Sequence, residues 1–322
     1  MTNRLVLVLV VGVALYPLAV SSPYALHMAI LALVAVGLAS ALNLIAGYAG
    51  QISFATGAFY GIGAYTAGIL ATRAGLDLWA TLPLAIVATG LIGLLLGIPC
   101  LRLRGHYLAI ATIGFQEGTI IVFLQWVDVT RGPMGITDIP KPSLPALPLD
   151  SLLANYYIAL VLVGLIVLLV IRLVASGLGL QMMAVRENET AARSVGVNTT
   201  YVKLAAFTIS SAMCGALGAF YAHYIGSIDP SVFGIVLSAT ALVMVLAGGW
   251  GTILGPIIGA VVLTYLPEWL RVLQDYRMSL YGAILILIIL FMPQGVLGVI
   301  SRLSSLFWRK GPAREEMESN AA

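Results

Sequence analysis

Charged residues are scarce in this sequence. Only 9% of its 322 residues are Asp, Glu, Lys or Arg, whereas 61% are hydrophobic, and the mean hydropathy is +1.04. So little polar surface could not cover a water-soluble globule of this length. The formal net charge is only +3, so the chain also lacks the basic face that nucleic-acid binding requires. The composition therefore indicates a polytopic protein surrounded by membrane lipid.

Cysteine and the common motifs of catalysis are scarce as well. The two cysteines, Cys100 and Cys214, show no Cys-x-x-Cys spacing and are interpreted as free, structural thiols. The chain contains no Gly-x-x-x-x-Gly-Lys-Ser/Thr motif, so it should not bind ATP itself. It also lacks the combination of a nucleophile and a base that would indicate an enzyme. We expect no catalytic, metal-binding or cofactor-binding residues. Energy must then enter from another chain or from an ion gradient.

Apolar stretches of membrane-spanning length recur along the chain. Bounded by charge, proline or glycine, they lie near 5–20, 26–46, 53–71, 79–98, 107–127, 152–172, 204–222, 234–248, 252–270 and 279–298. The stretch 234–248 is short, so nine spans are an alternative to ten. The first stretch is interpreted as a retained span, with a cleavable signal peptide as the alternative. The sequence predicts one all-α membrane domain over residues 1–322.

Basic residues predict the orientation of these spans. With the amino terminus in the cytoplasm, Arg102 and Arg104, the loop 173–203 and the tail 299–322 lie inside and hold most of the lysines and arginines. Both termini are then cytoplasmic. The longest external connection, 127–151, is rich in proline and glycine and is either a functional loop or a solvated connector.

The cytoplasmic loop 173–203 carries a helical pattern. Asn188 is a suitable N-cap, Glu189 follows in the first turn, and Gly196 is a suitable helix end. A shorter helix before it would place Leu180, Met183 and Ala184 on one side. Mixed charge at the rim favours a protein partner over anionic lipid, although a helix lying on the lipid headgroups is the alternative.

Within this loop, "VRENETAARSVGVN" resembles the coupling loop of ABC importer permeases. Their signature is Glu-Ala-Ala followed after three residues by Gly; Ala191, Ala192 and Gly196 match it, whereas Thr190 stands at the glutamate position and Glu189 one residue earlier. Other stretches resemble the LivM-like branch of the branched-chain amino-acid permease family, namely "ALNLIAGYAGQISFATGAFYGIGAYTAGIL", "LRLRGHYLAIATIGFQE", "RGPMGI", "GSIDPSVFG", "LAGGWGTILGPIIGA" and "MPQGVLG". The resemblance runs from about residue 36 to 300.

The resemblance implies a type II-like importer permease in a bacterial inner membrane. Its implied partners are a homologous LivH-like permease, two cytoplasmic ATP-binding subunits that hold ATP and magnesium, and a periplasmic solute-binding protein. Leucine, isoleucine and valine are the implied substrates, moved by alternating access, with urea, short amides and aromatic acids as alternatives. The residues expected to contact the ATPases are Arg186, Glu187, Glu189, Ala191, Ala192 and Gly196.

Polar residues inside the expected spans are candidates for a translocation path. Glu117 is the charged residue well inside a span, where a carboxylate should face the bundle or a water-filled path. Asn43, Gln51, Ser53 and Gln116 are further candidates, although interhelical hydrogen bonding explains them equally well. A gradient-driven secondary transporter in which Glu117 binds a proton or cation is the alternative from another functional class.

Glycine is abundant, and its spacing predicts close helix packing. Small residues share one helix face in two regions, and the glycines on these faces are Gly57, Gly61 and Gly68 in the first half and Gly251, Gly255 and Gly259 in the second. Each face follows a break, "AGYAG" at 46–50 and "AGGWG" at 247–251. The expected orientation places both breaks on the same side of the membrane, which suggests a weak internal repeat.

Overall fold

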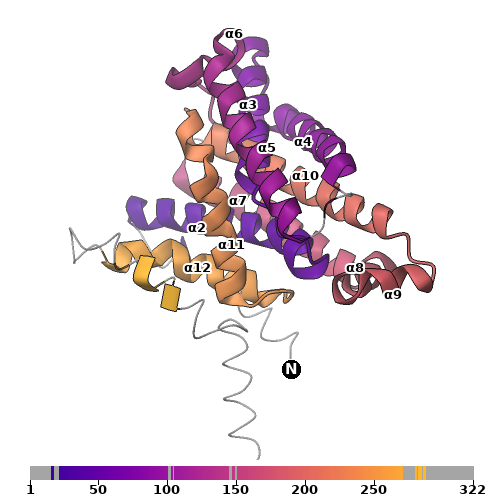
Figure 1. Cartoon of the computed structure of the whole chain (residues 1–322). Coiled ribbons are helices and arrows are strands. Elements are labelled where there is room, and N and C mark those ends of the chain that lie inside the picture. The colour runs from indigo at the N-terminus through magenta and orange to yellow at the C-terminus, as the bar shows by residue number, and fades with distance from the viewer. Residues whose placement is uncertain are drawn as a thin grey trace, which may run out of the picture.

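The computed structural model describes residues 16–17, 22–100, 103, 105–144, 147–148, 151–270, 280, 282–284 and 286–287. Helices make up almost all of this part of the chain (Figure 1). The α-helices are α2 (Pro23–Asn43), α3 (Thr56–Ala74), α4 (Leu78–Cys100), α5 (His106–Gln125), α6 (Val127–Thr130), α7 (Leu152–Val174), α8 (Gly177–Glu187), α9 (Glu189–Ser194), α10 (Thr199–Ile225), α11 (Ile235–Gly248) and α12 (Leu254–Trp269).

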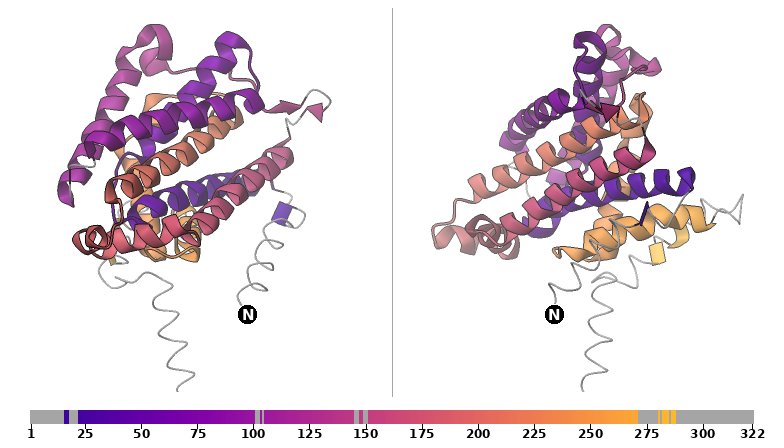
Figure 2. Two further views of the ribbon diagram at one scale, coloured as in Figure 1. Left: turned by 90° about the vertical axis from the view of Figure 1, so that its right-hand side faces the viewer. Right: turned by 180° about the vertical axis from the view of Figure 1, so that it is seen from behind.

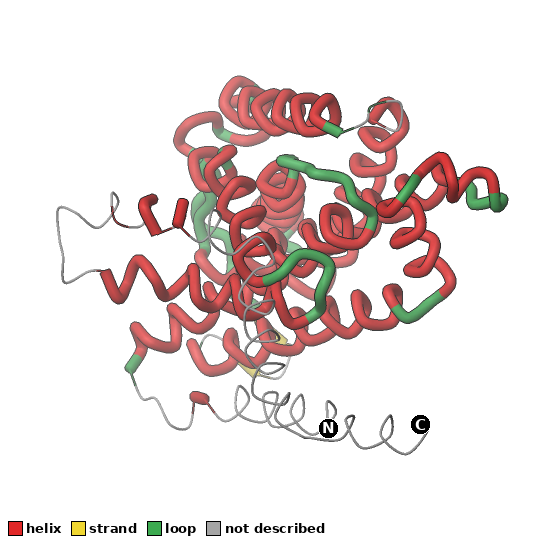
Figure 3. Tube along the Cα trace, turned by 60° about the horizontal axis from the view of Figure 1, so that its bottom comes forward, coloured by secondary structure: helices red, strands yellow, loops and turns green. Residues whose placement is uncertain are grey.

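Short elements connect these helices. A π-helix, η1 (Leu44–Tyr48), continues α2, and two 3-10 turns, η2 (Gly132–Met134) and η3 (Pro230–Phe233), lie in the long connections. Two strands, β1 (Ser143–Leu144) and β2 (Leu147–Pro148), form an antiparallel hairpin with Leu144 opposite Leu147. In Figure 3 the hairpin is the small yellow element among red helices. The part of the chain that the structure describes is therefore all-α apart from this hairpin.

Eight of the ten expected spans coincide with helices of the structure, from α2 to α12. The stretches 5–20 and 279–298 lie largely outside the described residues. Within the described residues, six helical segments are long and apolar enough to cross a membrane: α2 with η1, α4, α5, α7, α10, and η3 with α11; α12 is apolar but shorter. These segments make the chain an all-α polytopic membrane protein.

Helix α3 corresponds to the expected span 53–71, but it is not one of the six apolar segments. It packs against α10 and α4, and most of its residues are buried. A Cβ atom at Gly63 would lie 2.3 Å from the carbonyl oxygen of Gly215, and one at Gly218 would lie 2.0 Å from that of Tyr60. The backbones of α3 and α10 therefore touch, which only glycine permits.

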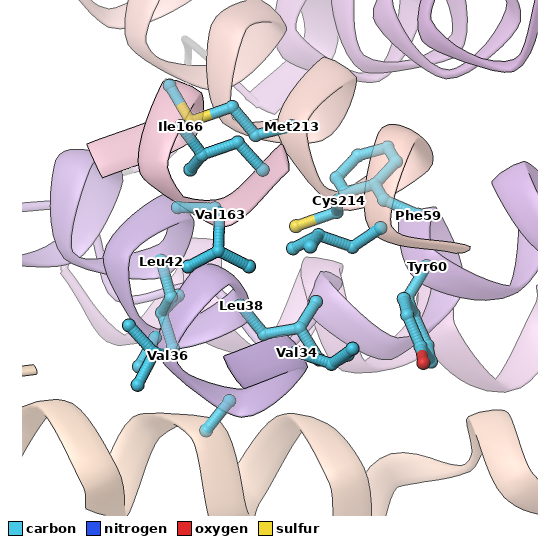
Figure 4. Packing of buried hydrophobic residues seen from close by; sticks show 14 of the residues in the cluster. Val34, Val36, Leu38, Leu42, Phe59, Tyr60, Val163, Ile166, Met213 and Cys214 are labelled. Atoms are coloured by element: carbon cyan, nitrogen blue, oxygen red, sulfur yellow. The ribbon is translucent and has the colours of Figure 1, made fainter. Parts of the chain in front are cut away.

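The apolar core joins α2, α3, α7 and α10. Figure 4 shows side chains from these four helices meeting at its centre, among them Val34, Leu38 and Leu42 of α2, Phe59 of α3, Val163 and Ile166 of α7, and Met213 and Cys214 of α10. All are at most 5% exposed. Several of these helices run roughly parallel in the views of Figure 2. Shape-matched packing, rather than the removal of apolar surface from water, holds such helices together in lipid.

The long connection after α5 is pinned to the segment between α10 and α11. Ile136 and Ile228 exchange two backbone hydrogen bonds of 2.9 Å. His223 of α10 is fully buried, with Nδ1 2.7 Å from the carbonyl oxygen of Pro140 and Nε2 2.9 Å from the hydroxyl of Thr81. The stretches "RGPMGI" and "GSIDPSVFG" thus form one ordered layer at this end of the bundle.

Candidate functional site: the knob and the glycine junction

The segment from Gly177 to Val197 forms a compact projection that we call the knob. It consists of α8 and α9, which lie together beyond α7 and α10 (Figure 1). The side chain of Asn188 accepts hydrogen bonds of 3.0 Å from the backbone N–H groups of Thr190 and Ala191, which confirms the expected N-cap. Gly196 adopts a φ of +87° as Val197 N donates to Ala192 O (3.0 Å), so α9 ends as expected.

Helix α8 packs against the bundle through a side that does not include Leu180. Its buried residues are Gly179, Met182 and Val185, whereas Leu180 is 65% exposed. A Cβ atom at Gly179 would lie 2.3 Å from the carbonyl oxygen of Val174. The glycine lets α8 press against the end of α7, and this contact decides which side of α8 is packed. Leu180, Met183 and Ala184 lie on one helix as expected, and none of the three is among the buried residues of α8.

An ion cluster fastens the knob to the start of α10. Glu189 accepts from Arg193 (Nη2–Oε1 2.7 Å) and pairs with Lys203 (Nζ–Oε2 2.9 Å). Arg193 Nε also donates to the hydroxyl of Thr199 (2.9 Å). The side chains of Glu189 and Lys203 are only 17% and 8% exposed, so this pair is less screened by water than a surface ion pair. Glu189 therefore engages its own chain.

The outward surface of the knob contains both expected and unexpected residues. Glu187, Ala191 and Gly196 are exposed, as an ATPase contact requires, whereas Ala192 is buried at 4% exposure. The sequence reasoning missed Val195, which is 79% exposed beside these residues. The sequence feature that could have indicated Val195 is a β-branched apolar residue within a short polar turn. Val195 and Leu180 are the large apolar groups that the knob presents outward.

Arg186 is exposed like its neighbour Glu187, but its guanidinium group reaches the first glycine break. Its Nη1 donates a 2.6 Å hydrogen bond to the carbonyl oxygen of Gly47, in η1. Gly50 has a φ of +69°, and a Cβ atom there would lie 3.1 Å from the Cγ atom of Arg186. A Cβ atom at Gly251 would lie 2.3 Å from the same Nη1. Glycine at these positions therefore leaves room for the guanidinium group.

Asn43 joins the two breaks directly. Its Oδ1 accepts from the backbone N–H of Gly251 (3.0 Å), and its Nδ2 donates to the carbonyl oxygen of Thr252 (2.8 Å). The two breaks, expected on one side, are thus in contact, and we call this contact the glycine junction (Gly47, Gly50, Gly251 and Asn43). The break after α2 includes a π-helical turn, a feature often found at functional sites. The knob touches the junction through Arg186.

Gln116 organises the start of α3. Its Oε1 accepts from Ala58 N (2.6 Å) and from the hydroxyl of Ser238 (3.1 Å), and its Nε2 donates to Phe233 O (2.6 Å). Ser53 is also buried, with its hydroxyl 3.3 Å from Ala55 N. Both side chains therefore bond within this chain, which ties α3, α5 and α11 together.

The other expected site residues lie in three settings. Gln51 is 8% exposed and borders a small void with Lys203, whereas Glu117 is exposed on α5. Among the glycines of α3, Gly57 and Gly61 pack on Phe233, and Gly68 packs on Ile139 and Ile228. In α12, Gly255 and Gly259 pack on backbone oxygens of α11 and of the turn that follows it. The structure thus brings Asn43 and Gly251 together and leaves Glu117 separate from both.

A cavity of about 530 Å³ lies between α3, α4, α5 and α6. It is lined mainly by apolar side chains, with the polar groups of Tyr65, Thr66, Thr119 and Thr130 among them. None of its lining residues is charged, so it offers no charged partner for the ammonium and carboxylate groups of a zwitterionic amino acid. We therefore do not place a solute in this cavity.

Comparison with known proteins identifies the family. The profile described as "Branched-chain amino acid transport system / permease component" matches residues 23–289. The chain belongs to this family. The permease protein LivM of a high-affinity branched-chain amino acid transport system is 37% identical in Salmonella typhimurium over 91% of this chain and 74% of that protein, and 37% identical in Escherichia coli over 88% and 74%.

A more distant relative carries a different description. LsrC, an autoinducer 2 import system permease protein of Escherichia coli, is 27% identical over 75% of this chain and 71% of its own. No solved structure matches the chain. Family membership makes this chain a permease component of a transport system and identifies it as a transport subunit. The matched region includes the knob and the glycine junction.

Proposed function

We propose that this chain is the membrane-spanning permease subunit of an ATP-driven importer for leucine, isoleucine and valine in a bacterial inner membrane. The observation that carries the proposal is the 37% identity to LivM along about nine-tenths of the chain. Urea, amides and aromatic acids are the alternative substrates, and LsrC illustrates that relatives serve other solutes.

The proposed partners are a homologous permease, two cytoplasmic ATP-binding subunits and a solute-binding protein outside. In this scheme the solute crosses between the two permeases, and the knob sits on an ATPase. Solute and nucleotide must each bind the outward-open and inward-open states of the complex with different free energies. Otherwise ATP binding could not be coupled to solute transport. Both termini then lie in the cytoplasm.

Arg186 supports a specific route for coupling. Because it reaches Gly47 and lies beside Gly251, a displacement of α8 moves the ends of α2 and α11 together. We propose that the ATPase contacts the knob at Leu180, Glu187, Ala191 and Val195. Arg186 then transmits the movement of the knob to the glycine junction. Arg186, Glu189 and Ala192 then act within the chain rather than as direct ATPase contacts.

Val195→Asp tests the proposed contact. A charge on this exposed apolar side chain should weaken the docking of the ATPase, so less ATPase should co-purify and uptake should fall by about tenfold or more. Met134→Asp is the matched control, because Met134 is 87% exposed and lies on η2, away from the knob. Ala192 is unsuitable for this test because a large substitution there disrupts packing. Normal ATPase recovery with Val195→Asp would contradict the assigned surface.

A further inference from the structure

Helix α5 carries an exposed stripe that interrupts an otherwise apolar outer surface. Its members are spaced by three and four residues and so share one helix face: Tyr107, Ile110, Gly114, Glu117 and Ile121. Tyr107, Ile110 and Ile121 are 72%, 65% and 51% exposed. Glu117 lies near the middle of this membrane-crossing helix, and no described residue of the chain forms an ion pair with it.

The outer faces of two other membrane-crossing helices, α4 and α7, are different. On α4 the exposed residues include Val87, Leu91 and Leu95, and on α7 they include Val161 and Leu165, all of which suit contact with lipid. The carboxylate of Glu117, near the middle of α5, would cost free energy if it faced lipid hydrocarbon, so it should face protein or water. The stripe on α5 is therefore unsuited to lipid in a way that α4 and α7 are not.

The glycines of α5 give a second, independent observation. Gly114 and Gly118 are four residues apart and flank Glu117, and a Cβ atom at either would meet nothing within 4 Å. By contrast, Gly63 and Gly259 are pressed against backbone atoms of neighbouring helices, and Gly215 is pressed against the side chain of Thr89. Gly164 of α7 is also open, but its exposed neighbours are apolar. Small residues at this spacing allow another helix to approach closely in lipid.

We infer that the α5 stripe is the docking surface for a helix of the second permease chain. That helix packs on Gly114 and Gly118 and presents a cationic or hydrogen-bond-donating side chain to Glu117. Charge complementarity favours this partner, since the carboxylate needs a donor at the depth of the membrane centre. The inference rests on the proposed function, which supplies the second permease and places the solute path beside it.

Photo-crosslinking in the assembled complex tests the docking surface. A photoreactive residue is placed at Ile110 or Ile121, and at Leu165 of α7 as the matched lipid-facing control. We expect covalent adducts with the second permease from the two α5 positions and adducts with lipid from Leu165. Only lipid adducts, or adducts with the solute-binding protein, from both α5 positions would overturn the inference.

Two substitutions test the role of the carboxylate. Glu117→Leu should weaken association with the second permease at least about tenfold, measured by co-purification, without lowering the yield of the chain itself. Glu117→Gln keeps hydrogen-bonding capacity and should retain more of the association. Undiminished association with Glu117→Leu would overturn the inferred donor. ATP-dependent uptake by the unmodified complex is measured alongside, so that failure of the proposed function is recognised separately.

Discussion

At the scale of single residues, a few side chains connect segments that are far apart in the sequence. Asn43 binds the turn before α12, Arg186 binds η1, and Gln116 binds both α3 and η3. In each case a polar side chain satisfies backbone groups at a helix end or break. Such groups would otherwise lack partners where water is excluded.

Arg186→Ala should uncouple the knob from the glycine junction. The lost hydrogen bond has a charged donor, a class worth about 1.5–3 kcal/mol, and partial exposure of Arg186 places it at the lower end. Docking of α8 on η1 should weaken by roughly tenfold. In the reconstituted complex, ATP hydrolysis should continue while uptake per ATP falls. Gln181→Ala, at an exposed position of α8 outside the proposed ATPase contact, is the control, and unchanged uptake per ATP with Arg186→Ala would contradict this role.

Gln116→Ala should destabilise the fold. It leaves Ala58 N and Phe233 O without their buried partner, at a cost of about 1–3 kcal/mol. Thermal unfolding in detergent should therefore shift to lower temperature. Gln125→Ala, at an exposed position on the same helix, should leave the transition nearly unchanged. Equal stability of the two variants would show that the network around Gln116 contributes little.

At the scale of helices, glycine positions decide which elements touch. The sequence spacing correctly predicted helical segments and a same-side arrangement of the two breaks, because apolar length and local break signals carry that information. It selected Gly57, Gly61 and Gly68, yet the most tightly packed glycine of α3 is Gly63, which lies on another face. That choice depends on where α10 lies, which local periodicity does not encode. The inward direction of Arg186 depends on tertiary position in the same way.

Gly63→Ala should disrupt the crossing of α3 and α10. The added methyl group would lie 2.3 Å from Gly215 O, and neither backbone can yield without shifting its helix. Overpacking of this kind costs about 1–3 kcal/mol and sometimes more, so the folded yield should fall. Gly164→Ala, in open space on α7, is the matched control and should fold normally. Comparable yields and melting temperatures would contradict the account of this crossing.

At the scale of the whole molecule, two surfaces remain for other chains. The knob projects beyond α7 and α10, and the α5 stripe lies on the outer face of the bundle. The sequence pointed to the knob through Asn188, Gly196 and its mixed charge, but exposure was needed to separate Val195 from Ala192. Likewise, Glu117 stood out in the sequence, whereas the open space at Gly114 and Gly118 became evident only in three dimensions.

We propose that transport by this permease is driven by ATPases that are separate subunits. The most direct test of this claim is uptake of radiolabelled leucine into membrane vesicles that contain both permeases and the solute-binding protein, with and without the ATP-binding subunits. We predict ATP-dependent accumulation only when those subunits are present. Accumulation that persists without them and follows an imposed ion gradient would contradict the claim.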